Sequence, residues 1–175
     1  MRQIQLTQEQ VALVSAEDFE AVNAHKWRAC KSKMTNTYYA QRNIRRGGKW
    51  TSQLMHQFIA ELIGLDLSNG RTVDHENHNT LDNTRGNLRS ATRTEQQRNK
   101  RKRTDNSSGL IGVTWHKASQ KWNAQARVNG RNKSLGLFDD LISAGWVRDN
   151  YVKQHHGEFA VLNNPPERRL KERAA

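Results

Sequence analysis

The sequence predicts an α+β protein made of two small units that are joined by a basic linker. Apolar and polar residues alternate over 113–128, as in half-buried strands, and a helical pattern follows from 141 to 152. Residues 1–60 mix short strand-like and helical segments. Between these regions, positive charge gathers at 98–103, and residues 105–109 are turn formers without apolar content. The expected organisation is a first unit at 1–103, a linker at 104–108, a second unit at 109–164 and a tail at 165–175.

The composition limits the size of the core and indicates the kind of partner. Only 34% of the 175 residues are hydrophobic and the mean hydropathy is −0.98, so one large core is not expected. The 29 Lys and Arg outnumber the 17 Asp and Glu, which gives a net charge of +12 and a pI near 10.3. A protein this basic usually binds a polyanion, most often nucleic acid. A generally solubilising surface is the other interpretation, and no basic amphipathic helix with a bulky apolar face suggests membrane binding.

The single cysteine, Cys30, excludes an intrachain disulfide and a zinc knuckle built from cysteine pairs. The N-terminus lacks the positive-then-apolar pattern of a signal peptide, and no apolar run approaches the roughly 20 residues of a membrane span. We therefore expect an intracellular protein.

Short strands and two helices are expected in the N-terminal region. The strands are predicted at 4–6, 11–14, 26–30, 37–44 and 49–54. Ser15 is expected to cap a short helix whose first turn carries acids. Apolar residues recur at three-and-four spacing from Met55 to Ile63, which predicts an amphipathic helix ended by Gly64. This region is either a platform for the residues that follow or an arm that contacts the partner. We favour a platform whose basic hairpin tip, residues 42–49, touches backbone phosphates.

An acid followed by a histidine closes the next strand-like segment. Asp74-His75 precedes an Asn- and Asp-rich loop, residues 77–83, and a helical pattern is predicted from Asn87 to about Asn99. A carboxylate is a preferred ligand of a hard divalent cation, and an adjacent imidazole can deprotonate water. The pair therefore indicates a one-metal nuclease site. The simpler interpretation is a turn at a strand end with a surface histidine.

Basic residues follow the acid–histidine pair. Arg85, Arg89 and Arg93 are four residues apart, which predicts a stripe on or near one face of the expected helix. The dense run of Lys and Arg after it is either an extended strap along phosphates or a solvated, disordered segment. The positions expected to contact DNA in this region are Arg85, Arg93, Arg101, Lys102 and Arg103.

The second unit is predicted to be a three-stranded antiparallel sheet backed by one helix, with a hairpin turn at 129–130. The side chains expected to face inward are Val113, Trp115, Trp122, Ala124, Ala126 and Val128. Those expected to face outward and contact DNA are Thr114, His116, Asn123, Gln125 and Arg127, together with Asn132 and Ser134. A twisted sheet with such a polar face fits the major groove of double-stranded DNA, where Arg, Asn and Gln read base edges.

Both halves are similar to known families, and together the similarities cover nearly the whole chain. The segments 74–75, 81–83 and 87–89 resemble the HNH endonucleases, specifically the homing-type branch encoded by phages and introns. Segments 4–7, 11–14 and 38–40, with Trp27, also resemble the leader of those proteins. The C-terminal half resembles the Apetala2/ERF DNA-binding domain. The residues that carry this second resemblance lie at 112–113, 121–124, 127–128, 135–139 and 156–160, with Ala144 and Tyr151.

The first resemblance implies a ββα-metal fold and a role for each motif residue. His75 would be the general base that activates water, with Asn87 buttressing the loop and Arg89 near the phosphates. Asp74 would bind one divalent cation, Mg²⁺ or Mn²⁺, that neutralises charge on the scissile phosphate and stabilises the leaving 3′-oxygen. The third motif residue of the family is a His or Asn, and Gln96 stands at that position here. A Gln carbonyl is a legitimate ligand for a hard metal but reaches one methylene further.

These features lead us to expect a metal-dependent endonuclease that acts as a monomer on double-stranded DNA, by nicking or by double-strand cleavage. The expected location is the cytoplasm of a bacterial or phage-infected cell. The substitution at Gln96 keeps open a second function, a sequence-specific DNA-binding regulator with an inactive HNH scaffold. An RNA-directed nuclease or binder is disfavoured, because the outer sheet face lacks the aromatic pairs on which single-stranded RNA stacks. Gln96 is as readily a solvated helix position as a ligand.

Overall fold

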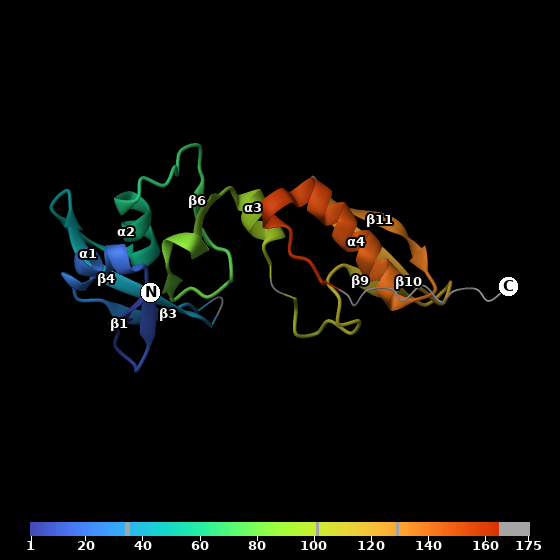
Figure 1. Ribbon diagram of the computed structural model, residues 1–175, viewed down its shortest axis with the longest axis horizontal. Coiled ribbons are helices and arrows are strands. Elements are labelled where there is room, and N and C mark those ends of the chain that lie inside the picture. Colours follow the sequence, from blue (N-terminus) through green and yellow to red (C-terminus); the bar gives the residue numbers. More distant parts are fainter. Residues whose placement is uncertain (34–35, 101, 129, 165–175) are drawn as a thin grey trace. The chain divides into compact units, whose positions relative to one another are not determined.

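The computed structural model describes residues 1–33, 36–100, 102–128 and 130–164. Its described residues form a mixed α+β protein with several small sheets and few helices (Figure 1). The chain separates into two compact units, the first ending at Gln96 and the second beginning at Gln97. This division lies within helix α3 (Arg93–Arg98), ahead of the 104–108 segment that the composition marks as a linker. The expected tail at 165–175 lies outside the described residues.

Unit 1 contains three small sheets. The strands are β1 (Arg2–Gln5), β2 (Val11–Val14), β3 (Arg28–Lys31), β4 (Tyr38–Arg46), β5 (Lys49–Leu54), β6 (Thr72–His75), β7 (Asp82–Asn83) and β8 (Leu88–Ala91). The sheet orders are β1-β2-β7, β3-β4-β5 and β6-β8, and only the β2–β7 pairing is parallel. The helical segments are η1 (Ala16–Asp18), α1 (Phe19–Asn23), α2 (Met55–Leu62) and η2 (Arg85–Asn87).

Helix α2 is confirmed and supplies the centre of the unit 1 core. Its Met55 and Ile59 are fully buried and pack with Val14, Trp27 and Leu88, which come from different elements. The helix ends shortly before Gly64, whose φ of +66° lies in the left-handed region that glycine adopts without steric cost. The amphipathic pattern therefore predicted both the helix and its end.

The helix predicted to begin at Asn87 is wrong in its first turns. Residues 88–91 form strand β8, which pairs with β6, and the helix begins only at Arg93. The reason is a capping box, because the Glu95 carboxylate accepts from the Thr92 main-chain N–H at 2.7 Å and Thr92 Oγ1 accepts from the Glu95 N–H at 3.3 Å. The predicted arginine stripe is consequently absent, since Arg89 lies on a strand.

Ser15 also has a different role from the one expected. It precedes η1, but its side chain makes no capping hydrogen bond to that segment. Its hydroxyl oxygen instead accepts from the main-chain N–H of Arg85 at 2.9 Å. The serine therefore ties two distant segments of unit 1 together.

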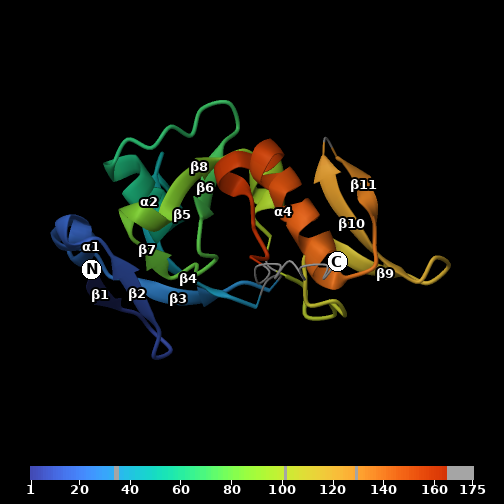
Figure 2. The ribbon, with the colours of Figure 1, turned by 45° about the vertical axis from the view of Figure 1, so that its right-hand side comes forward.

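Unit 2 has the order of elements that the sequence predicts. Strands β9 (Val113–His116), β10 (Lys121–Val128) and β11 (Arg131–Phe138) form an antiparallel sheet in the order β11-β10-β9. Helix α4 (Leu141–His156) lies against this sheet (Figure 2), and η3 (Gly157–Phe159) follows it. The Asp140 carboxylate caps α4 by accepting from the Ser143 N–H at 2.7 Å. Of the predicted turn residues, Asn129 lies outside the described residues.

The inward-facing assignment is wrong for Trp115. The core of unit 2 consists of Val113, Ala124 and Ala144 with several half-buried neighbours, but Trp115 is 46% exposed. Its ring meets that of Trp122 edge-on, with centroids 5.0 Å apart. Alternation places Trp115 on the helix side of the edge strand, and the helix does not cover that end of the strand well enough to bury an indole.

A buried polar network in unit 2 joins the segment before β9 to the segment after α4. The Arg148 guanidinium donates to the Asp149 carboxylate at 2.9 Å, and both side chains are 7% exposed. The same carboxylate accepts from the main-chain N–H groups of Asn163 and Asn164 at 2.6 and 2.9 Å. The Asn163 amide in turn bonds both main-chain polar groups of Ile111. The segment after α4 is thereby fixed to the segment that enters the sheet.

No helix in the described part of the chain has the length and apolar content needed to cross a membrane.

We expect Asp149→Ala to lower the unfolding free energy of unit 2 by about 3–5 kcal/mol, because it leaves a buried guanidinium without its counter-charge. Urea unfolding of the full chain, followed by circular dichroism, measures the change. Asp139→Ala is the matched control, because Asp139 is 86% exposed and its pair with Lys121 should contribute less than about 1 kcal/mol. Equal losses in the two variants would show that the network does not hold unit 2 together.

Candidate active site

One buried amide side chain holds the loop between β6 and β8. Asn87 Oδ1 accepts from the Asn77 main-chain N–H at 2.9 Å, and Asn87 Nδ2 donates to the Asp82 carbonyl at 2.7 Å. The Asn87 carbonyl also accepts from the Glu76 N–H at 3.0 Å. Asn87 is 6% exposed, so these bonds form away from bulk water. It is a structural support of the loop, which is the buttressing role that the resemblance implies.

Asp74 and His75 occupy the end of β6 and point to opposite faces of the hairpin, as successive strand residues do. Asp74 stands opposite Arg89 in the pairing with β8, and its Oδ2 accepts from Arg89 Nε at 3.1 Å. The Asp74 and Arg89 side chains are 14% and 13% exposed. The carboxylate expected to hold a cation therefore lies within an ion pair at a partly covered surface.

His75 faces the core, where its ring lies within hydrogen-bonding distance of Asn83. It is 7% exposed, and its Nε2 lies 3.4 Å from Asn83 Oδ1. Asn83 Nδ2 donates to the Leu81 carbonyl at 3.1 Å, which fixes the oxygen end of this amide toward His75. The imidazole proton therefore belongs on Nε2, and the lone pair of the neutral ring lies on Nδ1.

Burial lowers the pKa of His75 below 6.5, against the opposing effects of the Asn83 hydrogen bond and the carboxylates of Asp74 and Asp82. The histidine is therefore neutral at neutral pH. A neutral imidazole is the form that a general base requires.

A second buried histidine, which the sequence reasoning missed, packs on the first. His56 of α2 meets the His75 ring edge-on with centroids 5.0 Å apart, and Tyr39 packs on His56 in the same manner at 5.9 Å. Burial, and then the neighbouring His75, lower the pKa of His56 to about 3. Position 56 shares the buried face of α2 with Ile59 and Ala60, so the helical spacing itself marks it as an inward-facing histidine.

Gln96 lies on the Asp74 side of the hairpin. Its Nε2 donates to Thr72 Oγ1 at 2.7 Å and to the Val73 carbonyl at 3.3 Å, and Thr72 shares a strand face with Asp74. The amide carbonyl oxygen is then the atom with which Gln96 would ligate a cation. The Gln96 amide lies beside Thr72, two residues before Asp74 on the same face of β6. To bind a cation together with Asp74, the Gln96 side chain would have to turn toward that carboxylate.

Asp74 and Gln96 offer oxygen donors of the kind that a hard divalent cation prefers. Among the described residues, no three His, Cys, Asp or Glu side chains gather in a way that could hold a metal ion. Mg²⁺ is commonly bound by one or two carboxylates together with phosphate oxygens and water, and not by a full cage of protein ligands. Asp74 and the carbonyl of Gln96 are hard oxygen donors of that kind.

The basic residues expected to contact DNA in this region have different surroundings. Arg85 donates through Nε and Nη2 to the buried Asp18 carboxylate at 2.9 and 2.6 Å, so its guanidinium supports the interior of unit 1. Arg93 is exposed at the start of α3. Lys102 Nζ donates to the Gly109 carbonyl at 3.0 Å, and Arg103 pairs with Asp105 at the surface. Arg101 lies outside the described residues.

The outer face of the unit 2 sheet brings together the residues expected there. Register places Asn123 opposite Thr114, Gln125 opposite Ser134, Arg127 opposite Asn132 and His116 opposite Lys121. Ser134 Oγ donates to Asn123 Oδ1 at 2.9 Å, and Gln125 Nε2 donates to Thr114 Oγ1 at 3.5 Å.

Arg127 has an exposed side chain, while its main-chain carbonyl lies 3.1 Å from Nε2 of the buried His156. The helix thus holds the strand that carries this arginine, and leaves the guanidinium in solvent.

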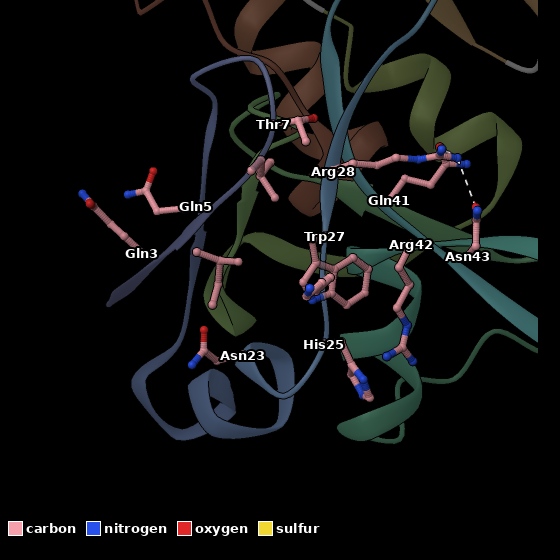
Figure 3. Close-up of a pocket in the computed structure, with 13 residues that line it drawn as sticks. Gln3, Gln5, Thr7, Asn23, His25, Trp27, Arg28, Gln41, Arg42 and Asn43 are labelled. Atoms are coloured by element: carbon pink, nitrogen blue, oxygen red, sulfur yellow. Dashed lines mark hydrogen bonds between the residues drawn. The ribbon is translucent and has the colours of Figure 1, made fainter.

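A groove of about 800 Å³ with mixed polar and apolar lining lies elsewhere in unit 1 (Figure 3). It is lined by segments 3–7 and 23–28 together with residues 41–43, and it contains none of the residues expected at the active site. Figure 3 shows Arg42 beside Trp27, and the Arg42 guanidinium lies 5.0 Å from that ring.

The chain is similar to a phage protein over part of its length. The chain is 29% identical to Protein 3.8 of Escherichia phage T7 over 105 residues, which are 60% of this chain and 86% of the phage protein. No family model and no solved structure matches the chain significantly.

We expect the stability of unit 1 to depend on the protonation of His56. Because the pKa of the folded state, about 3, lies below that of an unfolded histidine, the unfolded chain binds the extra proton between about pH 6.5 and 3. The free energy of unfolding of unit 1 is therefore unaffected by the protonation of His56 above pH 6.5 and decreases as the pH falls below it, by about 2 kcal/mol at pH 5.

Urea unfolding at pH 7.5 and pH 5 measures this dependence. His56→Phe keeps a ring against Tyr39 and His75 but cannot be protonated, so the difference between the two pH values should shrink. His116→Phe, at an exposed position, is the control and should unfold with the pH dependence of the wild type. If His56→Phe also leaves that dependence unchanged, His56 is not the buried acid-sensitive group.

Proposed function

We propose that this protein is a metal-dependent HNH endonuclease that hydrolyses phosphodiester bonds of double-stranded DNA. The observation that carries the proposal is the β6–β8 hairpin. A carboxylate and a neutral, oriented imidazole occupy consecutive positions on it, on opposite faces; the loop between the strands is held by Asn87, and α3 follows. Two paired strands followed by a helix are the order of elements in the ββα-metal motif that the sequence resembles.

In this proposal the residues of the hairpin have separate roles in hydrolysis. His75 accepts a proton from the attacking water at Nδ1, while its Nε2–H donates to Asn83 and keeps the ring oriented. Asp74 and the Gln96 carbonyl hold one Mg²⁺ or Mn²⁺. When bound, this cation neutralises charge on the phosphate. Arg89 is adjacent to Asp74, where its guanidinium is positioned for a phosphate oxygen.

The outer face of the unit 2 sheet is proposed to select the DNA. Its arginine, amide and hydroxyl groups are those that read base edges in the major groove, and Arg127 is exposed for a bidentate contact to guanine. The Apetala2/ERF resemblance and the net charge of +12 support the same interpretation. The ion pair between Asp74 and Arg89, and the position of the Gln96 amide at Thr72, favour the second function, a DNA-binding regulator with an inactive scaffold.

Cleavage of supercoiled plasmid distinguishes the two functions. We expect nicked or linear product with Mg²⁺ or Mn²⁺ and none with EDTA. His75→Ala should slow cleavage by about 10²–10⁴-fold, because it removes the general base. Asp74→Asn should weaken the response to metal. Because burial lowers the pKa of His75, the rising limb of the rate against pH should lie below pH 6.5, with a plateau near neutrality.

His78→Asn is the matched control, since it changes another histidine of the same loop and asparagine tolerates the positive φ of 62° at that position. It should cut as the wild type does. A gel shift of DNA without cutting at any tested metal would favour the regulator. Loss of activity in all the variants together would indicate a damaged loop and would contradict the assigned roles.

Arg127→Ala should reduce discrimination between sequences by about 1–3 kcal/mol, because one bidentate base contact is lost while the main-chain bond to His156 remains. A preferred duplex is selected from a random library, and its affinity is compared with that of the remaining pool. Replacing Arg101, Lys102 and Arg103 together with Gln should instead weaken binding to every sequence and flatten the salt dependence. Equal weakening for all sequences by Arg127→Ala would contradict readout by the sheet.

A further inference from the structure

The hairpin formed by β4 and β5 carries an exposed tryptophan at its tip. Trp50 is 75% exposed, whereas Trp27 is 6% exposed and Trp115 46%. An exposed indole costs free energy in water unless a partner covers it, and Trp is one of the residues most enriched in binding sites. The two-residue turn at Gly47-Gly48, with φ values of +57° and +79°, projects this segment beyond the core.

One cation lies on the same face of the hairpin as the indole, and two more lie at the tip on the other face. Register places Trp50 opposite Arg45, and Lys49 opposite Arg46. All four side chains are exposed, and Arg45 Nε donates to the Gly48 carbonyl at 3.2 Å, which holds its guanidinium at the turn. An aromatic side chain among cations is the combination that binds the bases and phosphates of a nucleic-acid strand.

Polar and cationic side chains also lie on the Trp50 face of the sheet away from the hairpin tip. By alternation and register, the face of the sheet that carries Trp50, the outer face, also carries Arg45, Ser52, Asn43, Gln41 and Arg28, with Leu54, Tyr39 and Cys30 toward the other end. Arg28 donates to Gln41 Oε1 and Asn43 Oδ1 at 3.3 and 3.1 Å, and Figure 3 shows these three side chains together. The opposite side of the sheet faces the core, where the Arg42 guanidinium lies over the Phe58 ring at 4.5 Å.

The charged side chains on the strands of this sheet are all cationic. Strands β3, β4 and β5 contain six Lys or Arg and no Asp or Glu. Glu61 of α2 pairs with Arg46, which alternation assigns to the other side of β4. A polyanion would therefore meet no carboxylate from these strands on the outer face.

We propose that the outer face of the β3–β4–β5 sheet is a nucleic-acid binding surface, with Trp50 stacking on a base that is unpaired or opened from the duplex. This inference rests on the proposed function for its partner, DNA. Stacking distinguishes it from a tip that touches only phosphates, because an indole adds nothing to a purely electrostatic contact. It also gives unit 1 a binding site for single-stranded or locally opened DNA that is separate from the unit 2 sheet.

The test measures binding in EDTA, so that cleavage plays no part. One mixed-sequence DNA is used as a full duplex and as the same duplex with a single-stranded tail that contains 2-aminopurine. Trp50→Ala and Trp50→Leu should bind the tailed DNA about 5- to 150-fold more weakly, the range expected for one lost base stack. Trp50→Phe should retain most of the affinity. Wild type and Trp50→Phe should quench 2-aminopurine, and the Ala and Leu variants should not.

Binding to the full duplex should change little in these variants, and unfolding in urea checks that each is folded. Equal weakening on duplex and tailed DNA would overturn the proposal, as would unchanged affinity of Trp50→Ala beside clear losses in Arg45→Ala and Lys49→Ala. If only the proposed nuclease activity is wrong, plasmid remains uncut, but the Trp50 variants still bind the tailed DNA with the relative affinities given above.

Discussion

The β6–β8 loop depends on a single buried amide. Asn87 uses its oxygen to accept from the Asn77 N–H and its nitrogen to donate to the Asp82 carbonyl, so one side chain satisfies a main-chain group on each arm of the loop. An aspartate of the same shape lacks the donor, and it would place a second oxygen against a carbonyl in a site shielded from water. The positions of Asp74 and His75 at the start of this loop follow from that requirement, because the loop leaves β6 directly after them. One buried side chain thus fixes the loop that follows Asp74 and His75.

Burial of His75 has two consequences that oppose each other. Removal from water disfavours the imidazolium and is the largest influence on the pKa of this histidine, outweighing the hydrogen bond to Asn83 and the nearby carboxylates. The result is a neutral ring with a defined tautomer. The same burial leaves only 7% of the residue exposed to solvent. Burial also lowers the pKa of His56, which packs on His75, so both rings are neutral at neutral pH.

The sequence predicted local structure well where hydrophobic periodicity was decisive, as in α2 and in the β9–β11 sheet with α4. It was wrong at 87–92, where β8 pairs with β6 and the Thr92–Glu95 capping box starts the helix only at Arg93. Long-range partners were not predictable in this way. Arg85 satisfies the buried Asp18, 67 positions away, and no local pattern shows that pairing. Trp115 illustrates a further limit, since alternation gives the face of a strand and not the extent to which a helix covers it.

Most of the net positive charge lies on the strands of two of the three-stranded sheets, β3-β4-β5 in unit 1 and β9-β10-β11 in unit 2. The strands of the first contain six Lys or Arg and those of the second contain four, and none of the six strands contains Asp or Glu. These strands therefore carry +10 of the net charge of +12. The other 19 Lys and Arg are nearly balanced by the 17 Asp and Glu. In both sheets the outer face carries mainly polar and cationic side chains, with Trp50 at the hairpin tip of the first, while the inner face packs on the hydrophobic core. This arrangement favours two polyanion-binding faces, one in each unit, over a charge whose only effect is solubility.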